Sequence, residues 1–330
     1  MKVFRGISHA IPASPCALTI GNFDGVHLGH QALLAEVRHA ADRLNLTASV
    51  MTFEPHPREF FAHRAGDPSK APSRIANLRD NMNAMNDAGI DHVIVEHFND
   101  TFANQSPDDF IKKILVDGLH VKWLMVGEDF CFGAKRAGNI ALLKQAGQQY
   151  GFSVETLPTV NHEGLRISSS AVRQALADGD FQQAQALLGH SYSITGRVVH
   201  GQKLGRTIGY PTLNVRVAHQ HPAVHGVFVV QVHGLEKHPL PAVASIGNRP
   251  TVEDAGRVLL ETHIFDYNQQ CYGKLVQIEF LQKIRGEQKF PDLISMTNAI
   301  DNDAAQARNY FHERQISATP LRTNSATDRI

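Results

Sequence analysis

The stretch GNFDGVHLGH, residues 21–30, decides the fold of the first half of the chain. An apolar run, residues 17–20, precedes it, and an amphipathic stretch, residues 31–37, follows it. This order predicts a strand, a glycine-rich turn and a helix that begins near Leu28. The free backbone N–H groups and the dipole at the start of such a helix favour a bound anion.

Two histidines and three glycines give this stretch its chemistry. His27 and His30 are three residues apart, so on a helix they share one face. Two imidazoles at a helix start can donate hydrogen bonds to a phosphate and stabilise negative charge that develops on it. Gly21, Gly25 and Gly29 allow the backbone to approach a ligand closely, although they could also serve only a tight turn.

Zinc is the alternative ligand for this pair of histidines. It would need further Cys, His or carboxylate ligands at a suitable spacing, and Cys16, Cys131 and Cys271 stand alone in the sequence. Three isolated cysteines also indicate a reducing compartment and no disulfide framework. We therefore favour phosphate binding over metal binding at this loop.

Length and charge set the broad class. At 330 residues the chain fits two domains better than one, and 42% hydrophobic residues support packed cores. Lys+Arg and Asp+Glu both number 32, so we expect no nucleic-acid partner. Since we find neither a secretory signal nor a run of about eighteen apolar residues, we expect a cytoplasmic protein without a membrane partner. A homo-oligomer is left open.

Strand and helix patterns alternate through residues 1–188. Strands are predicted at 17–20, 49–53, 92–95, 123–126 and 152–157, and helices at 73–88, 107–116, 139–150, 168–177 and 181–188. This alternation predicts a Rossmann-like α/β domain, with a parallel sheet and helices on both faces. In such sheets ligands bind beyond the C-terminal ends of the strands, where we expect the loops 21–30, 53–57 and 126–133.

The pattern changes after residue 188. Short alternating runs, separated by Gly, Pro and Asn turns, occupy residues 192–200, 226–233, 242–246, 258–265 and 275–281. They predict an antiparallel β-barrel, followed by a terminal helix at 292–311. We expect this domain over 189–316 and a loose polar tail over 317–330.

Two further stretches are suited to phosphate. RISSSAVRQAL, residues 166–176, places three serines at a helix start between two arginines, which is either a plain N-cap or a phosphate site. GRVVHGQKLGRTIGYPTLN, residues 196–214, alternates glycine with basic residues, either as a phosphate loop or as a glycine hairpin.

Three residues of the second half carry candidate catalytic chemistry. Thr212 and Asn214 are two apart on a predicted strand, so they point to the same side. Their hydroxyl and amide oxygens suit a nucleotide-bound Mg²⁺. Glu261 lies in VLLETHIFDY, residues 258–267, where an acid is costly to bury without a partner or a function. It is either a general base or part of a structural ion pair.

The ordered motifs resemble those of bacterial bifunctional riboflavin kinase/FAD synthetases, over residues 15–313. The first resembles G-x-F-D-G-x-H-x-G-H, a long form of the H-x-G-H signature of nucleotidyltransferases. Residues 53–57 resemble F-x-P-H-P, residues 126–138 resemble V-G-x-D-F-x-F-G-x-x-R-x-G, and residues 167–173 resemble I-S-S-x-x-V-R. Residues 196–214 resemble the riboflavin kinase signature, which ends in P-T-x-N. Cys131 stands where many relatives carry Arg.

This resemblance implies a nucleotidyltransferase domain followed by a riboflavin kinase domain, with ATP and Mg²⁺ as cosubstrate and metal. The kinase domain would phosphorylate riboflavin to FMN, with Glu261 accepting the proton of the 5′-hydroxyl and Thr212 and Asn214 holding the metal. The first domain would join FMN to the adenylyl group of a second ATP, giving FAD and pyrophosphate, with His27 and His30 stabilising charge. The alternatives are another H-x-G-H transferase fused to a flavin-binding barrel, and a flavin-binding protein without catalysis.

Motifs and resemblance together predict the binding residues. Nucleotide or phosphate contacts are expected at Gly21, Phe23, Asp24, Gly25, Gly29, Arg166, Ser168, Ser169, Arg173, Gly201, Lys203, Gly205, Arg206 and Gly209. Flavin contacts are expected at Phe53, Pro55, Pro57, Asp129, Phe130 and Arg285, although Arg285 could be a structural neighbour instead.

Overall fold

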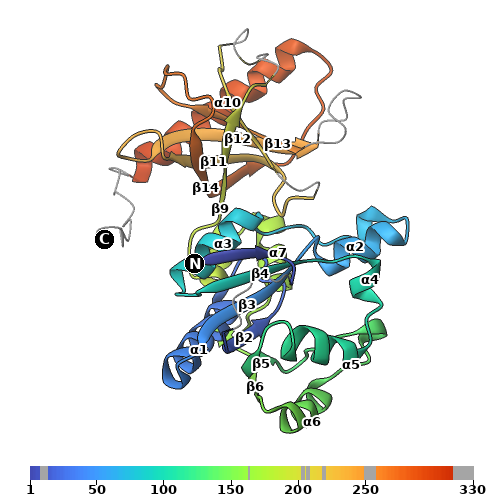
Figure 1. Cartoon of the computed structure of the whole chain (residues 1–330). Helices are drawn as coiled ribbons and strands as arrows, with labels where there is room; N and C mark the ends of the chain where they lie inside the picture. Colours follow the sequence, from blue (N-terminus) through green and yellow to red (C-terminus); the bar gives the residue numbers. More distant parts are fainter. Residues whose placement is uncertain are drawn as a thin grey trace. The chain divides into compact units, whose positions relative to one another are not determined.

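The structure is a computed structural model that describes residues 1–7, 14–162, 164–201, 205, 209–217, 221–248 and 258–314. It divides into two compact units, which we describe separately (Figure 1). The first unit comprises Met1–Ser73, Leu78–Val172 and Leu187–Gly189. The second comprises Arg74–Asn77, Arg173–Ala186 and the described residues from His190 onward.

A six-stranded parallel sheet forms the centre of the first unit, in the order β1-β4-β3-β2-β5-β6. The strands are β1 (Lys2–Arg5), β2 (Cys16–Ile20), β3 (Thr47–Glu54), β4 (His92–His97), β5 (Val121–Gly127) and β6 (Ser153–Leu157). The strand order reverses between β2 and β5, which is where doubly wound sheets bind their ligands. The predicted Rossmann-like domain is therefore confirmed, with β1 as a strand that the prediction missed.

Helices cover both faces of this sheet. They are α1 (Leu28–Leu44), α2 (Pro57–Arg64), α3 (Leu78–Asp87), α4 (Asp100–Ala103), α5 (Pro107–Asp109), the π-helical η2 (Phe110–Val116) and α6 (Ile140–Tyr150). Ala17 packs with residues of α1 and α3, whereas its neighbour Leu18 packs with residues of η2 and α6. Successive strand residues point to opposite faces, so one strand serves both cores.

The predicted helix at 73–88 is wrong in its first turn, because α3 begins only at Leu78. The preceding residues belong to the second unit. The backbone of Arg74 exchanges hydrogen bonds with His221 and Ala223, and the Asn77 side chain donates to the carbonyl of Thr195 at 2.9 Å. These long-range bonds hold the segment outside the helix, which no local pattern can reveal.

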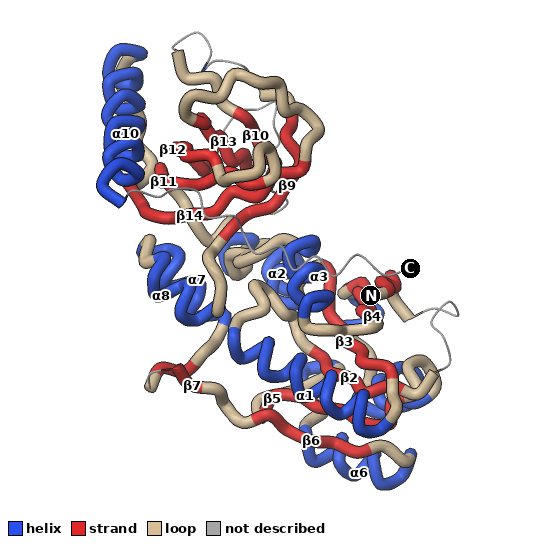
Figure 2. The backbone as a smooth tube through the Cα atoms, turned by 90° about the vertical axis from the view of Figure 1, so that its left-hand side faces the viewer, coloured by secondary structure: helices blue, strands red, loops and turns tan. Residues whose placement is uncertain are grey.

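A closed antiparallel barrel forms the centre of the second unit, in the order β10-β13-β12-β11-β14-β9. Its strands are β9 (Ser193–Val199), β10 (Leu213–Arg216), β11 (Gly226–His233), β12 (Leu240–Asn248), β13 (Val258–Ile264) and β14 (Leu275–Arg285). The terminal helix α10 (Leu293–Arg314) lies along the barrel, where Ala304 and Ala307 pack on Val227 and Val243 (Figure 2). The predicted barrel with a terminal helix is confirmed, and the predicted tail at 317–330 lies outside the described residues.

The helices α7 (Ser169–Asp178) and α8 (Phe181–Leu188) contribute to the second unit from Arg173 to Ala186. The Lys283 ammonium group donates to the carbonyl of Ala177 at 2.9 Å. The buried Phe181 ring lies 5.8 Å from the rings of both Phe228 and Phe280. The part of α7 and α8 from Arg173 to Ala186 therefore packs with the barrel. The predicted domain boundary after residue 188 stays a prediction.

Phe181→Ala should destabilise the barrel by about 3 kcal/mol, because it leaves a cavity between the aromatic rings of β11 and β14. Amide hydrogen exchange in these two strands measures this loss locally. Phe181→Leu, which keeps most of the volume, should cost less than about 1.5 kcal/mol. Unchanged exchange in Phe181→Ala would contradict the packing role.

Candidate active sites

The loop after β2 brings together His27 and His30, the two histidines with a predicted role in phosphate binding. The backbone N–H of His30 donates to Nδ1 of His27 at 3.3 Å, so His27 caps α1. The two rings stack with their centroids 3.7 Å apart, which confirms the shared face that their spacing predicts. His27 is buried and His30 half-buried. A stacked imidazole pair at a helix start can hold the charge of a phosphate.

The rest of the loop is held rigidly. Phe23 is fully buried, with its ring 5.0 Å from that of His30. Asp24 is also buried, and the N–H of Gly25 donates to the Asn81 side chain on α3 at 3.0 Å. This fixation suits a site in which backbone groups must be preorganised.

Gly21 and Gly29 lie at close approaches between the backbone and aromatic rings. A Cβ atom on Gly21 would lie 3.1 Å from the Phe23 ring, and one on Gly29 would lie 3.3 Å from the His27 ring. The same Cβ on Gly29 would lie 3.8 Å from Ile167, the residue before the serines. The loop 21–30 and the serine motif are therefore neighbours, as their predicted shared role requires.

Ser168 is an N-cap, because its hydroxyl accepts a hydrogen bond from the N–H of Ala171 at 3.2 Å. The phosphate role of Ser168 stays a prediction. Arg166 approaches Asp129 to 3.6 Å, which brings the serine motif to the loop after β5. Ser169 is half-buried at the start of α7. Arg173 belongs to the second unit, so its part in this site stays a prediction.

A cavity of about 630 Å³ lies at the C-terminal ends of β2 and β3 and beside the loop after β5. Seven phenylalanines form its apolar walls: Phe53, Phe61, Phe98, Phe102, Phe110, Phe130 and Phe132. Gly21, Pro57 and Asp129 also line it, together with the cations Arg58, Lys135 and Arg136. Such walls and cations suit an aromatic ring system that carries a negative charge.

The flavin residues expected in the first unit are largely brought together here. Phe53, Pro57, Asp129 and Phe130 line the cavity, whereas Pro55 does not. Neither histidine is among its lining residues. Three lining residues were missed because they lie outside every recognised motif: Phe61 on α2, Phe98 in the loop after β4, and Phe102 on α4.

In the barrel, Asn214 of β10 lies directly opposite Glu261 of β13. Directly paired residues of antiparallel strands point to the same face, so the amide and the carboxylate are neighbours. Thr212, which precedes β10, lines one cavity of about 260 Å³ together with Glu261. The three residues expected to carry the second chemistry therefore meet, although they come from segments far apart in the sequence.

Glu261 is half-buried, so it does not bear the full cost of a deeply buried acid. The reason is the alternation of β13: Leu260 and Thr262 are buried, and Glu261 points to the other side. There the carboxylate faces the cavity rather than an apolar core, which leaves it accessible to a substrate.

The described glycines of the second motif surround these residues. A Cβ atom on Gly201 would lie 2.5 Å from the Asn214 amide nitrogen, so any larger residue would displace this side chain. Gly205 lines the cavity of Glu261, and Gly209 has a φ of +85°. Lys203 and Arg206 lie outside the described residues.

Tyr210, which the motifs did not single out, joins this segment to the terminal helix. Its hydroxyl donates to the Asp301 carboxylate of α10, and this hydrogen bond raises the pKa of Tyr210 to about 12. Tyr210 therefore stays protonated at neutral pH. It also lines the cavity of Glu261, so its hydrogen bond to Asp301 connects this cavity wall to α10.

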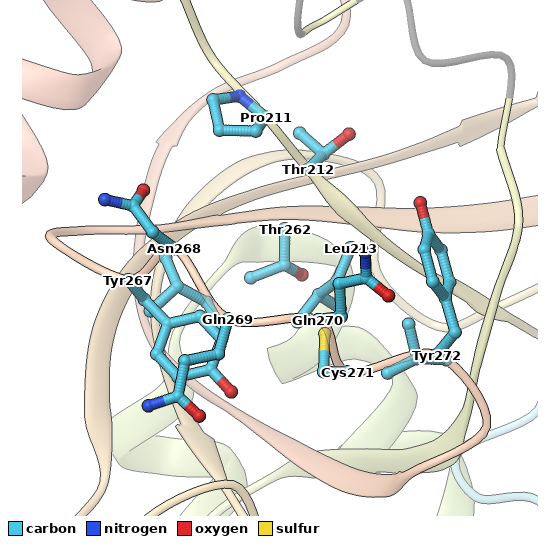
Figure 3. A pocket seen from close by; sticks show the side chains of 12 residues that line it. Pro211, Thr212, Leu213, Thr262, Tyr267, Asn268, Gln269, Gln270, Cys271 and Tyr272 are labelled. Atoms are coloured by element: carbon cyan, nitrogen blue, oxygen red, sulfur yellow. The ribbon is translucent and has the colours of Figure 1, made fainter.

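A second cavity of the barrel, of about 270 Å³, also reaches Thr212 (Figure 3). Its lining residues are Val198, Pro211, Thr212, Leu213, Thr262, Ile264, Tyr267, Asn268, Gln269, Gln270, Cys271 and Tyr272. None of these described residues is Asp, Glu, Lys, Arg or His, so the cavity suits an uncharged ligand group.

Comparison with known proteins identifies the family. A model of FAD synthetase matches residues 10–171, and a model of riboflavin kinase matches residues 188–311. The chain is 46% identical over 313 residues to the bifunctional riboflavin kinase/FMN adenylyltransferase of Haemophilus influenzae, covering 94% of this chain and 100% of that protein. The chain belongs to this family.

Other relatives agree. The bifunctional riboflavin kinase/FMN adenylyltransferase of Escherichia coli K12 is also 46% identical, over 94% of this chain and 98% of that protein. The Pseudomonas fluorescens enzyme of the same name is 44% identical, over 93% and 97%. A crystal structure titled macrolide-efflux protein from Streptococcus pneumoniae shares the fold, with a TM-score of 0.75 and 30% identity over 94% of this chain and 99% of that chain.

No helix in the described part of the chain is long and apolar enough to cross a membrane.

The described residues contain no group of three His, Cys, Asp or Glu side chains placed to hold a metal ion. The Thr212 hydroxyl and the Asn214 amide offer oxygen atoms, the ligands that Mg²⁺ prefers, and their role as metal ligands stays a prediction.

Arg285 has a structural partner. Its guanidinium donates hydrogen bonds to both oxygens of the buried Asp303 carboxylate of α10, with Nε–Oδ1 2.9 Å and Nη2–Oδ2 2.7 Å. It also lines the Glu261 cavity, with its guanidinium carbon 5.5 Å from the centre of the Phe290 ring. The structural role is therefore established by geometry, while a flavin contact of Arg285 stays a prediction.

Proposed function

We propose that the barrel phosphorylates riboflavin to FMN and that the parallel-sheet unit adenylylates FMN to FAD, each with its own ATP. The observation that carries this proposal is the pairing of Asn214 with Glu261 beside the cavity that Thr212 lines, in a chain matched by both family models. We propose cytoplasmic action on these small molecules, without a nucleic-acid or membrane partner.

In the barrel, the Glu261 carboxylate accepts the proton of the riboflavin 5′-hydroxyl. The hydroxyl oxygen forms a bond to the γ-phosphorus of ATP, the bond from this phosphorus to the β-phosphate oxygen breaks, and FMN and ADP leave. Thr212 and Asn214 would hold Mg²⁺, which neutralises charge on the phosphate oxygens. The barrel residues mainly position the two substrates for an in-line transfer.

The two barrel cavities suggest where the substrates lie. The cavity of Glu261 has apolar walls from Val227, Val243 and Phe290, which suit the flavin ring. The cavity on the other side of Thr212 has no charged lining residue among those described, which suits the nucleoside of ATP. Thr212 lines both, so the transferred phosphate would lie beside it.

In the parallel-sheet unit, an FMN phosphate oxygen attacks the α-phosphorus of the second ATP and pyrophosphate leaves. This nucleophile is already an anion, so no general base is needed. His27, His30 and the start of α1 stabilise the charge on the reacting phosphates, with Ser169 and Arg166 as further candidates. The phenylalanine-lined cavity takes the flavin ring.

Incubation of the pure protein with riboflavin, ATP and Mg²⁺, followed by chromatography of the flavins, tests the proposal. FMN should form first and FAD should follow. Another adenylated product would favour a different H-x-G-H transferase, and unchanged bound riboflavin would favour a flavin-binding protein without catalysis.

Removal of Mg²⁺ by a chelator should abolish the formation of FMN and of FAD, because the charge on the phosphates would no longer be neutralised. Resupply of Mg²⁺ should restore both products. FMN formation that persists in excess chelator would contradict a metal role of Thr212 and Asn214.

A further inference from the structure

Thr212 lies at the edge of the regular barrel pairing. β10 begins at Leu213, which is the first residue of this strand to pair with β13, and Thr212 precedes it. Pro211 has no backbone N–H and therefore cannot donate a hydrogen bond that would extend the ladder. The position of the Thr212 hydroxyl thus depends on contacts outside the regular strand pairing.

The side chain of His263 supplies one such contact. Its Nδ1 donates a hydrogen bond to the carbonyl oxygen of Pro211 at 2.9 Å, since a carbonyl oxygen can only accept. His263 follows Glu261 by two residues on β13, so the two side chains point to the same side of the strand. Both also line the cavity that Thr212 lines. The strand that carries the candidate base therefore holds the residue directly before Thr212.

Tyr210 holds the same segment from other directions. Its hydroxyl donates to the Asp301 carboxylate of α10, and its backbone N–H donates to the carbonyl of Gly205 at 2.7 Å. Its ring lies edge-on to the His263 ring, with the two centroids 5.1 Å apart. The segment 210–212 is therefore fixed by α10, by β13 and by the glycine motif.

The barrel core does not explain these contacts. The residues of β13 on its buried side are Leu260, Thr262 and Ile264, whereas His263 is half-buried on the other side. What the contacts do fix is the placement of a side chain that would act on a phosphate. An error of about 1 Å in such a placement can cost about 10²-fold in rate.

We propose that His263 and Tyr210 are positioning residues for the phosphoryl transfer, which act through Thr212. They hold the backbone before Thr212, so that its hydroxyl keeps the orientation that the transferred phosphate and its metal require. This inference rests on the proposed kinase function of the barrel.

Two substitutions of His263 separate the hydrogen bond from the imidazole. The amide nitrogen of asparagine can take the place of Nδ1 and donate to Pro211, whereas leucine cannot donate. We expect His263→Leu to lower kcat for FMN formation by about 10–100-fold and to raise the Mg²⁺ concentration for half-maximal rate by about 3–10-fold. His263→Asn should keep both values within about three-fold of wild type. Tyr210→Phe, which loses the bond to Asp301, should shift both values about 3–10-fold in the direction of His263→Leu.

Amide hydrogen exchange, in protein without nucleotide or metal, tests the positioning role independently of activity. In His263→Leu the amides of Thr212 and Leu213 should exchange about 3–10-fold faster than in wild type, because the segment opens more readily without the bond to Pro211. His263→Asn should keep the wild-type exchange. Exchange in β11 and β14 should be unchanged in both variants, because the barrel itself stays folded.

His238→Leu is the matched control, because it makes the same change at an exposed residue of the loop between β11 and β12. It should leave FMN formation, its Mg²⁺ dependence and the exchange of Thr212 and Leu213 unchanged.

The inference is overturned if His263→Leu keeps the wild-type Mg²⁺ dependence, or the wild-type exchange at Thr212 and Leu213. It is also overturned if His263→Asn loses as much activity as His263→Leu, which would indicate a direct role of the imidazole. Exchange that rises equally in β11 and β14 would overturn it too, since it would indicate general destabilisation. Failure of wild-type protein to make FMN would instead contradict the kinase function itself, so the two failures are distinguishable.

Discussion

Glu261→Gln is expected to lower kcat for FMN formation by about 10²–10⁴-fold, the usual contribution of a general base. Glutamine keeps the size and polarity of the side chain beside Asn214 but cannot accept the 5′-hydroxyl proton. Steady-state formation of FMN from riboflavin measures the loss. FAD formation from supplied FMN should stay within about two-fold of wild type, because it uses the other unit.

Glu313→Gln is a matched control for this variant, since it makes the same chemical change at the exposed end of α10. It should leave both activities unchanged. Near-normal FMN formation by Glu261→Gln would remove the carboxylate from the proposed role. Loss of both activities in a folded variant would contradict the model of two separate sites.

His27→Asn is expected to lower the rate of FAD formation by about 10²–10³-fold, the size of effect seen when one charge-stabilising donor is lost. Asparagine is a preferred N-cap residue, so it can replace the acceptor that His27 offers to the N–H of His30. The variant therefore separates the imidazole from its capping role. FAD formation from FMN and ATP is the measurement, and FMN formation from riboflavin should persist.

His39→Asn provides the control, because His39 is an exposed residue of the same helix. It should leave FAD formation unchanged. If His27→Asn made FAD at the wild-type rate, the histidine pair would not stabilise charge on the reacting phosphates, and the loop would serve only as a tight turn.

Local patterns were sufficient for most elements. Apolar runs predicted β2 and β11, and helical patterns predicted the start of α1 and the span of α6, because these signals act within a few residues. The start of α3 could not be predicted in this way. Residues 74–77 are held by partners more than one hundred residues later in the chain.

The sequence predicted those site residues that belong to a recognised motif. The spacing of Thr212 and Asn214 predicted a shared side, but their meeting with Glu261 depends on the pairing of β10 with β13, which periodicity cannot specify. The half-burial of Glu261 follows from the alternation along β13. The phenylalanine cavity was only partly predicted, since its outer wall comes from α2 and the region of α4.

The composition of the second unit has a consequence for how such chains can be recombined. This unit also contains Arg74–Asn77 and Arg173–Ala186, which are encoded upstream of residue 189, the expected start of the second domain. A single genetic crossover at that residue would join the barrel of one relative to the Phe181 segment of another. Exchange of halves between relatives should therefore succeed only when both upstream segments travel with the barrel or match its surface.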